Sequence, residues 1–376
     1  MKHYLTRRAV LKWLETPSAY QIAKDELYEL DNASFSFLKN CSSPEGGVSN
    51  NSAFIDYCVE EGLLTTTPHA VRRPALQQAH APSLRYLELQ ITDACNLRCR
   101  HCYIDEGGRN ELIPAEVNRI LREFEQMQGL RVLITGGEPL VHSAFHEINE
   151  MLPDFFIRKV LFTNGVLLDK NALKTLKVDE IQVSIDGLEP AHDLLRGSGM
   201  FKQSLEAVRR ALDAGFDVSV STMVHPYNVG DFDSMEQLFR GMQIKDWTVD
   251  IPCLTGRLKG NKEFYVSPEE GGKYLSYGYG SGLHASMQGY GCGLHLMAVM
   301  ANRNISKCTF YGDQPVGTID QGLKESWINL RPVKLKNLEC CCEYLEVCRG
   351  GCRYRAELLE GKGGKDPYRC MLYGIL

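Results

Sequence analysis

The chain has no long apolar run and no excess of basic residues. Nowhere in its 376 residues is there an unbroken apolar stretch of about 18 residues, the minimum expected of a membrane-spanning helix. Its 42 Lys and Arg residues are outnumbered by 47 Asp and Glu residues, giving a net charge of −5, whereas a nucleic-acid-binding domain carries a basic patch or stripe. The composition therefore argues against a membrane protein and against a nucleic-acid-binding protein. The length suits two or three folded units.

The N-terminal segment lacks the features of a complete export signal. Arg7 and Arg8 precede a few apolar residues, as in twin-arginine signals, but Lys12 and Glu15 interrupt the apolar region. No Ala-x-Ala cleavage site follows. We therefore expect a short amphipathic helix here and a cytoplasmic protein.

Cysteine, in contrast, is abundant. The chain has 14 cysteines, and six of them fall between Cys340 and Cys370. In a reducing cytoplasm, such a set is typical of metal ligation rather than of disulfides. We therefore expect the clustered cysteines to bind metal.

The most informative cysteines are Cys95, Cys99 and Cys102, which form a C-x3-C-x2-C pattern on one short segment. A cubane [4Fe–4S] cluster normally has four cysteine ligands, so three close thiolates without a local fourth predict a cluster with one open iron. An open iron can bind a small molecule and pass it an electron. The alternative is a structural zinc site, although such sites usually show paired C-x2-C units.

Residues 1–66 are expected to form a first unit, in which short strand-like pieces are followed by a helix that begins near Asp31. A second helix is expected in SNNSAFIDYCVEEGLL, with Ser49 or Asn51 as its N-cap. Residues 67–84 are punctuated by proline and show little periodicity, so we expect a linker there.

A regular alternation of strand-like and helix-like segments follows over residues 85–254, which is typical of βα units with a parallel sheet. Six strands are expected, at 86–92, 131–136, 159–164, 180–186, 217–224 and 246–252. Five helices are expected between them, at 114–128, 143–155, 169–177, 201–215 and 231–243. The predicted fold class is α/β, with a partial (β/α)6 barrel of the TIM-like kind.

Residues suited to ligand binding follow four successive strands of this predicted barrel. They are the three cysteines after the first strand, then the segments 136–139, 163–165 and 184–187. In βα barrels the chemistry takes place at the carboxyl ends of the strands. We therefore expect one functional site at that rim.

The alternation stops near residue 255. Residues 255–376 are rich in Gly and Tyr, and the cysteines return there. We expect a third unit of short hairpins and a helix, organised by metal rather than by a large apolar core.

The C-x3-C-x2-C segment, the GGEP run at 136–139 and the six-unit barrel together resemble the radical SAM superfamily over roughly residues 85–252. The resemblance implies a [4Fe–4S] cluster whose open iron binds the amino and carboxylate groups of S-adenosyl-L-methionine (SAM). One electron would cleave the sulfonium and yield a 5′-deoxyadenosyl radical, which abstracts hydrogen from a substrate. The cofactors supply this chemistry, and the protein supplies orientation and exclusion of side reactions.

The same resemblance assigns the GGEP run to SAM binding. Gly136 and Gly137 let the backbone approach the ligand, because no side chain is in the way. Their carbonyls and the carboxylate of Glu138 suit the cationic amino group of SAM.

Further SAM-binding candidates follow the later strands and the cysteine segment. Ser184 and Asp186 suit the ribose hydroxyls or the methionine end of SAM. Arg196, expected in a loop, suits the SAM carboxylate through a charge-assisted pair. Asn164 is a candidate from the third strand end, and Tyr103 is expected to pack near the adenine.

The third unit resembles a SPASM domain, an extension that carries auxiliary iron–sulfur clusters. The matching cysteines are Cys292, Cys308, Cys342, Cys348, Cys352 and Cys370. One position departs from the family pattern, because Glu339 stands where a cysteine is expected; Cys340 or Cys341 can take its place, and we favour Cys340. By analogy, the first auxiliary cluster takes three evident ligands, Cys292, Cys308 and Cys352. The second takes Cys340, Cys342, Cys348 and Cys370, for which structural zinc is the alternative.

The remaining cysteines carry weaker signals. Cys253 ends the sixth predicted strand, where it would face the rim. We favour a packed cysteine at this position, and a metal ligand or a substrate-handling thiol is the alternative. Cys41 and Cys58 fit core positions of helices, and no chemistry is assigned to them.

The first unit resembles the winged-helix-type recognition domains of peptide-modifying radical SAM enzymes, on the segments DELYELDNASFSFL and CVEEGLL. Such domains add a peptide to a sheet edge through main-chain hydrogen bonds. The resemblance implies a maturase of a ribosomally made precursor peptide, which introduces an oxidation or a crosslink. It also implies a low-potential electron donor such as a flavodoxin or a ferredoxin.

Two other functions stay open at this point. One is the modification of tetrapyrrole side chains, as in haem-related members of the superfamily. The other is a non-catalytic iron–sulfur or zinc protein, which has no need of a GGEP run. A sulfatase-maturing role is disfavoured, because that family carries Asp directly after the cysteine that matches Cys308, where this chain has Thr309.

Overall fold

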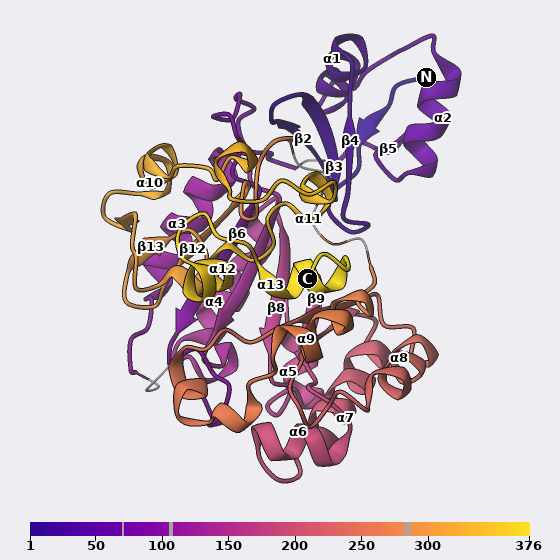
Figure 1. The fold of residues 1–376 in the computed structure, drawn as a ribbon. Helices are drawn as coiled ribbons and strands as arrows, with labels where there is room; N and C mark the ends of the chain where they lie inside the picture. Colours follow the sequence, from indigo (N-terminus) through magenta and orange to yellow (C-terminus); the bar gives the residue numbers. More distant parts are fainter. Residues whose placement is uncertain (70, 105–107, 281, 283, 285–286) are drawn as a thin grey trace.

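A nine-stranded sheet forms the centre of the computed structural model, which describes residues 1–69, 71–104, 108–280, 282, 284 and 287–376 (Figure 1). Six neighbouring strands run parallel, in the order β11-β10-β9-β8-β7-β6. They are β6 (Tyr86–Thr92), β7 (Arg131–Gly136), β8 (Arg158–Thr163), β9 (Glu180–Ser184), β10 (Asp217–Met223) and β11 (Asp246–Asp250). All six predicted strands are confirmed, with ends that differ by two residues at most.

Amphipathic helices follow the parallel strands and bury their apolar faces. The five predicted helices are present as α3 (Pro114–Gln126), α4 (Phe145–Met151), α5 (Lys170–Thr175), α7 (Met200–Asp213) and α8 (Phe232–Gly241). In α3, Val117, Ile120, Leu121 and Phe124 recur at helical spacing and are all buried in the main core. The predicted α/β class with a partial (β/α)6 barrel is confirmed, because six neighbouring strands are parallel and helices follow them.

The expectation of a loop around Arg196 is wrong, because α6 (Glu189–Arg196) covers this segment. Pro190 lies in the first turn, where its missing N–H costs little. Gly197 ends the helix with a φ of 122°, which favours glycine. The helix has only 8 residues, too few for its periodicity to stand out in the sequence.

The C-terminal unit adds three strands to the same sheet. β12 (Leu296–Val299) pairs in parallel with β6, and β13 (Asn304–Ser306) and β14 (Gly317–Thr318) continue the sheet antiparallel. Met297, Val299 and Ile305 join the main core, so the prediction that this unit lacks a large apolar core is wrong. Its helices are α9 (Pro268–Gly271), α10 (Leu323–Asn329), α11 (Leu345–Cys348), α12 (Arg353–Glu360) and α13 (Pro367–Leu372). Across the described residues, no helix has the length and apolar character needed to cross a membrane.

The N-terminal unit consists of two small antiparallel sheets and two helices. The strands are β1 (Tyr4–Leu5) paired with β5 (Leu64–Thr65), and β2 (Ala9–Trp13), β3 (Pro17–Gln21) and β4 (Glu26–Glu29) in sequence order. The predicted helix starts are confirmed, because the side chains of Asp31 and Asn51 cap α1 (Asn32–Cys41) and α2 (Ser52–Glu60). The expected amphipathic helix at the start of the chain is wrong, since β1 and β2 occupy that segment.

The predicted linker at 67–84 is fastened to the N-terminal unit. The guanidinium of Arg73 donates hydrogen bonds to the carbonyl oxygens of Leu5, Thr6 and Ala9. The described part of the segment contains no helix or extended strand. It is therefore an extended connection that is held along the unit it leaves.

The N-terminal unit, drawn in indigo in Figure 1, packs against the amino ends of the parallel strands. Arg158, the first residue of β8, donates hydrogen bonds to the carbonyls of Ile22 and Ala23 at 3.0 and 3.1 Å. Asp25 pairs with Arg131, the first residue of β7, at 2.7 Å, and with Arg158 at 3.4 Å. The carboxyl ends of the strands are thereby left for the site.

Candidate functional site

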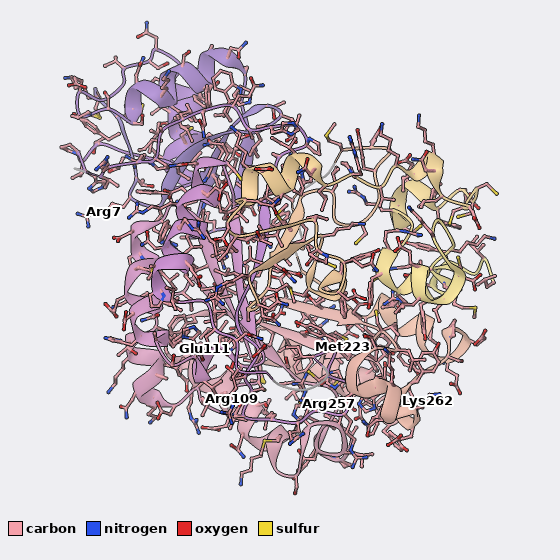
Figure 2. The ribbon with its side chains drawn as sticks, turned by 90° about the vertical axis from the view of Figure 1, so that its left-hand side faces the viewer. Arg7, Arg109, Glu111, Met223, Arg257 and Lys262 are labelled. Atoms are coloured by element: carbon pink, nitrogen blue, oxygen red, sulfur yellow. The ribbon has the colours of Figure 1, made fainter. Side chains whose placement is uncertain are left out.

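A cavity of about 270 Å³ lies at the carboxyl ends of the parallel strands. Its wall contains Cys95, Cys99 and Cys102, together with residues from β7, β8, β9 and β10. Figure 2 shows Met223 and Arg257, which both line this cavity, at the end of the sheet away from Arg7 of the N-terminal unit. The structure therefore gathers the candidate residues at the rim where the sequence places them.

The cysteine loop after β6 is anchored to two distant segments. The N–H of Arg100 donates to the carbonyl of Leu195 at 3.0 Å, and the N–H of Arg257 donates to the carbonyl of Cys102 at 2.9 Å. Burial raises the pKa of the Cys102 thiol, and the neighbouring Cys99 adds to this effect. Burial therefore disfavours the thiolate form of Cys102. A bound positive centre such as iron would reverse this, because a thiol loses its proton when it binds metal.

Gly136 and Gly137 lie where side chains would not fit. A β-carbon on Gly137 would meet the carbonyl oxygen of Ala94 at 2.3 Å, and one on Gly136 would meet that of Thr92 at 2.6 Å. The N–H of Glu138 donates to the Ala94 carbonyl at 2.8 Å, so the end of β7 presses directly against the cysteine loop. Both glycines line the cavity and leave bare backbone for a ligand.

Glu138 does not reach the cavity surface. Its side chain is completely buried and accepts hydrogen bonds from the Thr163 hydroxyl and the Asn164 N–H, each at 2.8 Å. Burial raises the pKa of Glu138 to about 7, although these hydrogen bonds favour the charged form. In this structure Glu138 ties the end of β7 to the end of β8, and its contact with the SAM amino group stays a prediction.

Asp186 is also completely buried, and it is paired with Arg196. Arg196 Nε donates to Asp186 Oδ2 at 2.5 Å, and Arg196 Nη1 lies 3.8 Å from Cys99 Sγ. Burial alone would raise the pKa of Asp186, but the Arg196 charge holds it well below its usual range. Asp186 thus positions Arg196, which lies on the cavity wall beside the cysteine loop, and a contact of Asp186 with SAM stays a prediction.

The structure places Asn164, Ser184 and Tyr103 on the cavity wall. Asn164 Nδ2 donates to Asn96 Oδ1 at 2.8 Å, which links the end of β8 to the cysteine loop. The ring of Tyr103 packs against Phe310 of the C-terminal unit, with the ring centroids 5.4 Å apart. These residues can therefore contact a ligand directly.

Other wall residues were not singled out from the sequence; they include His101, Gln182, Ser221, Met223 and Arg257. Gln182 and Ser184 are two residues apart on β9, and Ser221 and Met223 are two apart on β10. The alternation of inward-facing positions along a strand could have identified them. His101 Nδ1 is buried and has no hydrogen-bond partner within the described ranges, so it is a polar atom that a bound ligand can satisfy.

A second cavity of about 560 Å³ lies between the barrel and the C-terminal unit. Cys292, Cys308 and Cys352 line it from three separate segments. Burial raises the pKa of Cys308 well above its usual value, and the neighbouring charges of Glu88, Cys292 and Cys352 add to the shift. The three cysteines assigned to the first auxiliary cluster are therefore brought together.

The second auxiliary group consists of Cys340, Cys342, Cys348 and Cys370. Burial raises the pKa of Cys340, with added effects of Cys348 and Cys342, and burial raises the pKa of Cys370 to about 11, with an added effect of Cys340. These thiols are thus neighbours, whereas Cys341 is exposed. In the part of the chain that the structure describes, no three His, Cys, Asp or Glu side chains lie close enough together to hold a single metal ion.

The remaining cysteines are buried. Cys253 is 3% exposed and lies on the wall of the first cavity. Cys41 and Cys58 belong to the apolar core of the N-terminal unit. Cys253 therefore remains a candidate metal ligand or substrate-handling thiol, whereas Cys41 and Cys58 have a packing role.

Known proteins resemble this chain in sequence. Residues 89–239 match the model of the radical SAM superfamily. The chain is 26% identical over 214 residues to an AdoMet-dependent heme synthase of Nitratidesulfovibrio vulgaris, which covers 55% of this chain and 58% of that protein. It is 33% identical over 159 residues to mycofactocin maturase MftC of Mycobacterium ulcerans, which covers 40% of this chain and 43% of that protein. The chain thus spans about half the length of these curated relatives.

A solved structure resembles the whole chain in fold. SuiB of Streptococcus suis, bound to its precursor peptide SuiA, superimposes with a TM-score of 0.69 at 14% identity and covers 97% of this chain and 98% of its own. The likeness at this identity concerns the fold, and it extends over the N-terminal and C-terminal units as well as the barrel. The matched family model, together with the cysteine loop at the barrel rim, identifies residues 89–239 as a radical SAM domain.

Proposed function

We propose that the chain is a radical SAM peptide maturase. It would cleave SAM reductively and abstract hydrogen from a ribosomal precursor peptide, which gives an oxidative modification or a crosslink. The observation that carries this proposal is the first cavity, in which Cys95, Cys99 and Cys102 lie beside the bare backbone of Gly136 and Gly137.

The residues of the rim fit the cofactors that this chemistry needs. Cys95, Cys99 and Cys102 would hold a [4Fe–4S] cluster, whose positive irons would offset the burial that raises the pKa of the Cys102 thiol. The glycine backbone and the unpartnered His101 Nδ1 supply room and polar atoms for SAM. When bound, the cluster and SAM supply an electron and a 5′-deoxyadenosyl radical.

The side chains of this protein would bind and orient these groups. Asp186 holds Arg196 in place, so that a fixed positive charge is available for the SAM carboxylate next to the cluster. Ser184 offers a hydroxyl to the ribose. Tyr103 and Phe310 would close one side of the cavity and limit the access of water, which protects a radical from side reactions.

The N-terminal unit supports a peptide as the substrate. We assign residues 1–66 to peptide recognition, 67–84 to the connection, 85–254 to the barrel and 255–376 to the auxiliary-cluster unit. β4 is an edge strand that pairs only with β3 among the described strands, so its outer main-chain groups can bind an added peptide strand. The likeness to SuiB, whose structure holds a precursor peptide, supports the same assignment.

The position of this unit sets a requirement on the peptide. β4 lies at the amino ends of the barrel strands, whereas the cysteine loop lies at their carboxyl ends. A bound peptide must therefore extend by at least one strand length, on the order of 20 Å, between the recognition segment and the modified residue.

The auxiliary groups would serve electron transfer. Cys292, Cys308 and Cys352 would hold one cluster. The second would be held by Cys340, Cys342, Cys348 and Cys370. We also propose a low-potential donor such as a flavodoxin or a ferredoxin, and a cytoplasmic location, because this number of metal-binding thiols needs a reducing compartment.

A tetrapyrrole-modifying enzyme is the second candidate. It is favoured by the match to the AdoMet-dependent heme synthase, which covers 55% of the chain against 40% for the mycofactocin maturase. In that case the substrate would be an iron porphyrin with carboxylate side chains rather than a peptide.

The two candidate functions can be distinguished by the substrate that the enzyme modifies. The anaerobically reconstituted enzyme would be incubated with SAM, a strong reductant and either a precursor peptide encoded by a neighbouring short reading frame or an iron porphyrin that carries propionates. The proposal expects a mass change in the peptide alone. A proline substitution at Leu27, which removes one main-chain N–H from the edge strand β4, should weaken peptide binding. A change in the porphyrin alone would favour the second candidate.

A further inference from the structure

Cys253 and Cys352 lie in contact although they belong to different units. Cys352, at the start of α12, packs against the buried cluster that contains Cys253. Tyr311 and Tyr354 are the other buried members of this cluster. The contact therefore joins the segment after β11 to the start of α12.

One buried arginine fixes both sides of this contact. Arg355 donates to the carbonyl of Ile251, two residues before Cys253, at 3.1 Å. It also donates to both carboxylate oxygens of Asp366, at 3.1 and 2.8 Å. Asp366 in turn accepts a hydrogen bond from the N–H of Cys352 at 2.8 Å. The placement of the two sulfurs is therefore built into the fold rather than left to mobile loops.

The same place holds the other cysteines of the first auxiliary group. Cys352 lines the second cavity with Cys292 and Cys308, and Cys308 packs against the buried group that contains Cys253. Four cysteines from four segments are thus gathered at the wall between the two cavities. Four is the number of cysteine ligands that a cubane cluster normally takes.

Resting on the proposed function, we propose that Cys253 is the fourth protein ligand of the first auxiliary cluster, together with Cys292, Cys308 and Cys352. On the family analogy only three ligands are evident for this cluster, so that one iron is either open or filled by another group. A fourth cysteine ligand closes it, so that it transfers electrons and does not bind the substrate. Since Cys253 also lines the first cavity, the cluster would lie directly behind the SAM cavity.

Cys348 is the competing candidate for the fourth position, because it also lines the second cavity. Its thiol is a neighbour of Cys340, in the second auxiliary group. If Cys253 is the fourth ligand, Cys253→Ala should leave one iron of the first auxiliary cluster without a protein ligand. If Cys348 is the fourth ligand, Cys348→Ala should do so instead.

The test uses the full chain with Cys95, Cys99 and Cys102 changed to Ala, so that only the auxiliary clusters can form. This parent protein should bind about eight irons, and added cyanide should leave its EPR spectrum unchanged. With Cys253→Ala added, one iron should lose its protein ligand. Cyanide should then shift the EPR signal of one cluster, or mild oxidation should convert that cluster to a [3Fe–4S] form. Cys58→Ala, which removes another buried cysteine, should leave iron content and spectra as in the parent.

A second variant covers the case in which Cys253→Ala loses the whole cluster. Cys253→Ser offers an oxygen ligand and should retain the iron while changing the Mössbauer spectrum of one cluster. Spectra and iron contents identical to the parent in both Cys253 variants would overturn the proposal. So would a cyanide shift in the parent itself, or a Cys348→Ala variant that alone opens the first cluster. This test does not depend on SAM turnover. The proposed function is tested independently, by the release of 5′-deoxyadenosine from the wild-type enzyme, so the failure of one can be told from the failure of the other.

Discussion

Arg196 Nη1 lies 3.8 Å from the sulfur of Cys99. The two residues come from the end of α6 and from the cysteine loop, and Asp186 holds the arginine from behind. A fixed cation at a thiolate ligand favours the reduced, more negative form of a cluster. We therefore expect Arg196 to affect both the stability of the rim and the reduction potential of a cluster held by Cys99.

The first prediction concerns this arginine. Arg196→Gln leaves the buried Asp186 without its cation, so the free energy of unfolding of the cluster-free protein should fall by about 3–5 kcal/mol in urea titrations. The reduction potential of the first cluster should also become more negative, as measured by EPR-monitored titration. Arg209→Gln on the exposed face of α7 is the matched control and should change neither value. If the reduction potential of the cluster is unchanged in Arg196→Gln, Arg196 has no electrostatic influence on it.

The second prediction concerns the close approach at Gly137. Gly137→Ala introduces a β-carbon that would lie 2.3 Å from the Ala94 carbonyl oxygen, so the cysteine loop must shift. We expect a stability loss of about 1–3 kcal/mol and weaker SAM binding in equilibrium dialysis. Gly241→Ala, where a β-carbon would meet no atom within 4 Å, should leave SAM binding unchanged. Equal SAM affinity in the two variants would contradict this role of the glycine.

The third prediction is a pH dependence that comes from Glu138. Burial raises its pKa to about 7, whereas an unfolded carboxyl titrates near pH 4.3. The native state therefore holds a proton that the unfolded state has lost, and the contribution of Glu138 to stability falls as pH rises from about 4.5 to about 7. The total is about 3 kcal/mol.

Glu138→Gln removes this titration. Urea unfolding at pH 4.5 and pH 8 should show that the stability of the variant relative to wild type rises by about 3 kcal/mol between the two conditions. A relative stability that does not change with pH, or that falls, would show that Glu138 is ionised in the folded protein throughout this range.

The fourth prediction separates two adjacent cysteines. Cys340 is a neighbour of Cys342 and Cys348, whereas Cys341 is exposed. Cys340→Ala should disrupt the second auxiliary cluster and lower the iron content by up to about four irons per chain. Cys341→Ala should keep the wild-type iron content. The opposite result in iron and sulfide analysis would assign the ligand to Cys341.

Much of the barrel could be predicted because its signals are local. Each of the six strands is a short segment in which β-branched or other apolar residues recur, and each long helix buries a stripe at helical spacing, as in α3. Helix α6 was missed because 8 residues carry too little periodicity. The parallel pairing of β12 with β6 was missed because no local pattern specifies a partner from another unit.

The site was predictable in its location but not in its internal contacts. The cysteine loop and the glycines were found because their spacing is unusual and because strand ends share one rim. The burial of Glu138 and Asp186 was not foreseen, since it depends on Thr163 and Arg196, which lie elsewhere in the chain. The contact of Cys253 with Cys352 is likewise a product of the folded chain.

The most direct test of the account is the anaerobic reaction of the reconstituted enzyme with SAM and a strong reductant, followed by chromatography for 5′-deoxyadenosine. The wild-type chain should release it, and a chain with Cys95, Cys99 and Cys102 changed to Ala should not, although its auxiliary clusters stay loaded. A wild-type protein that carries its full iron content and releases no 5′-deoxyadenosine would show that this chain does not cleave SAM reductively.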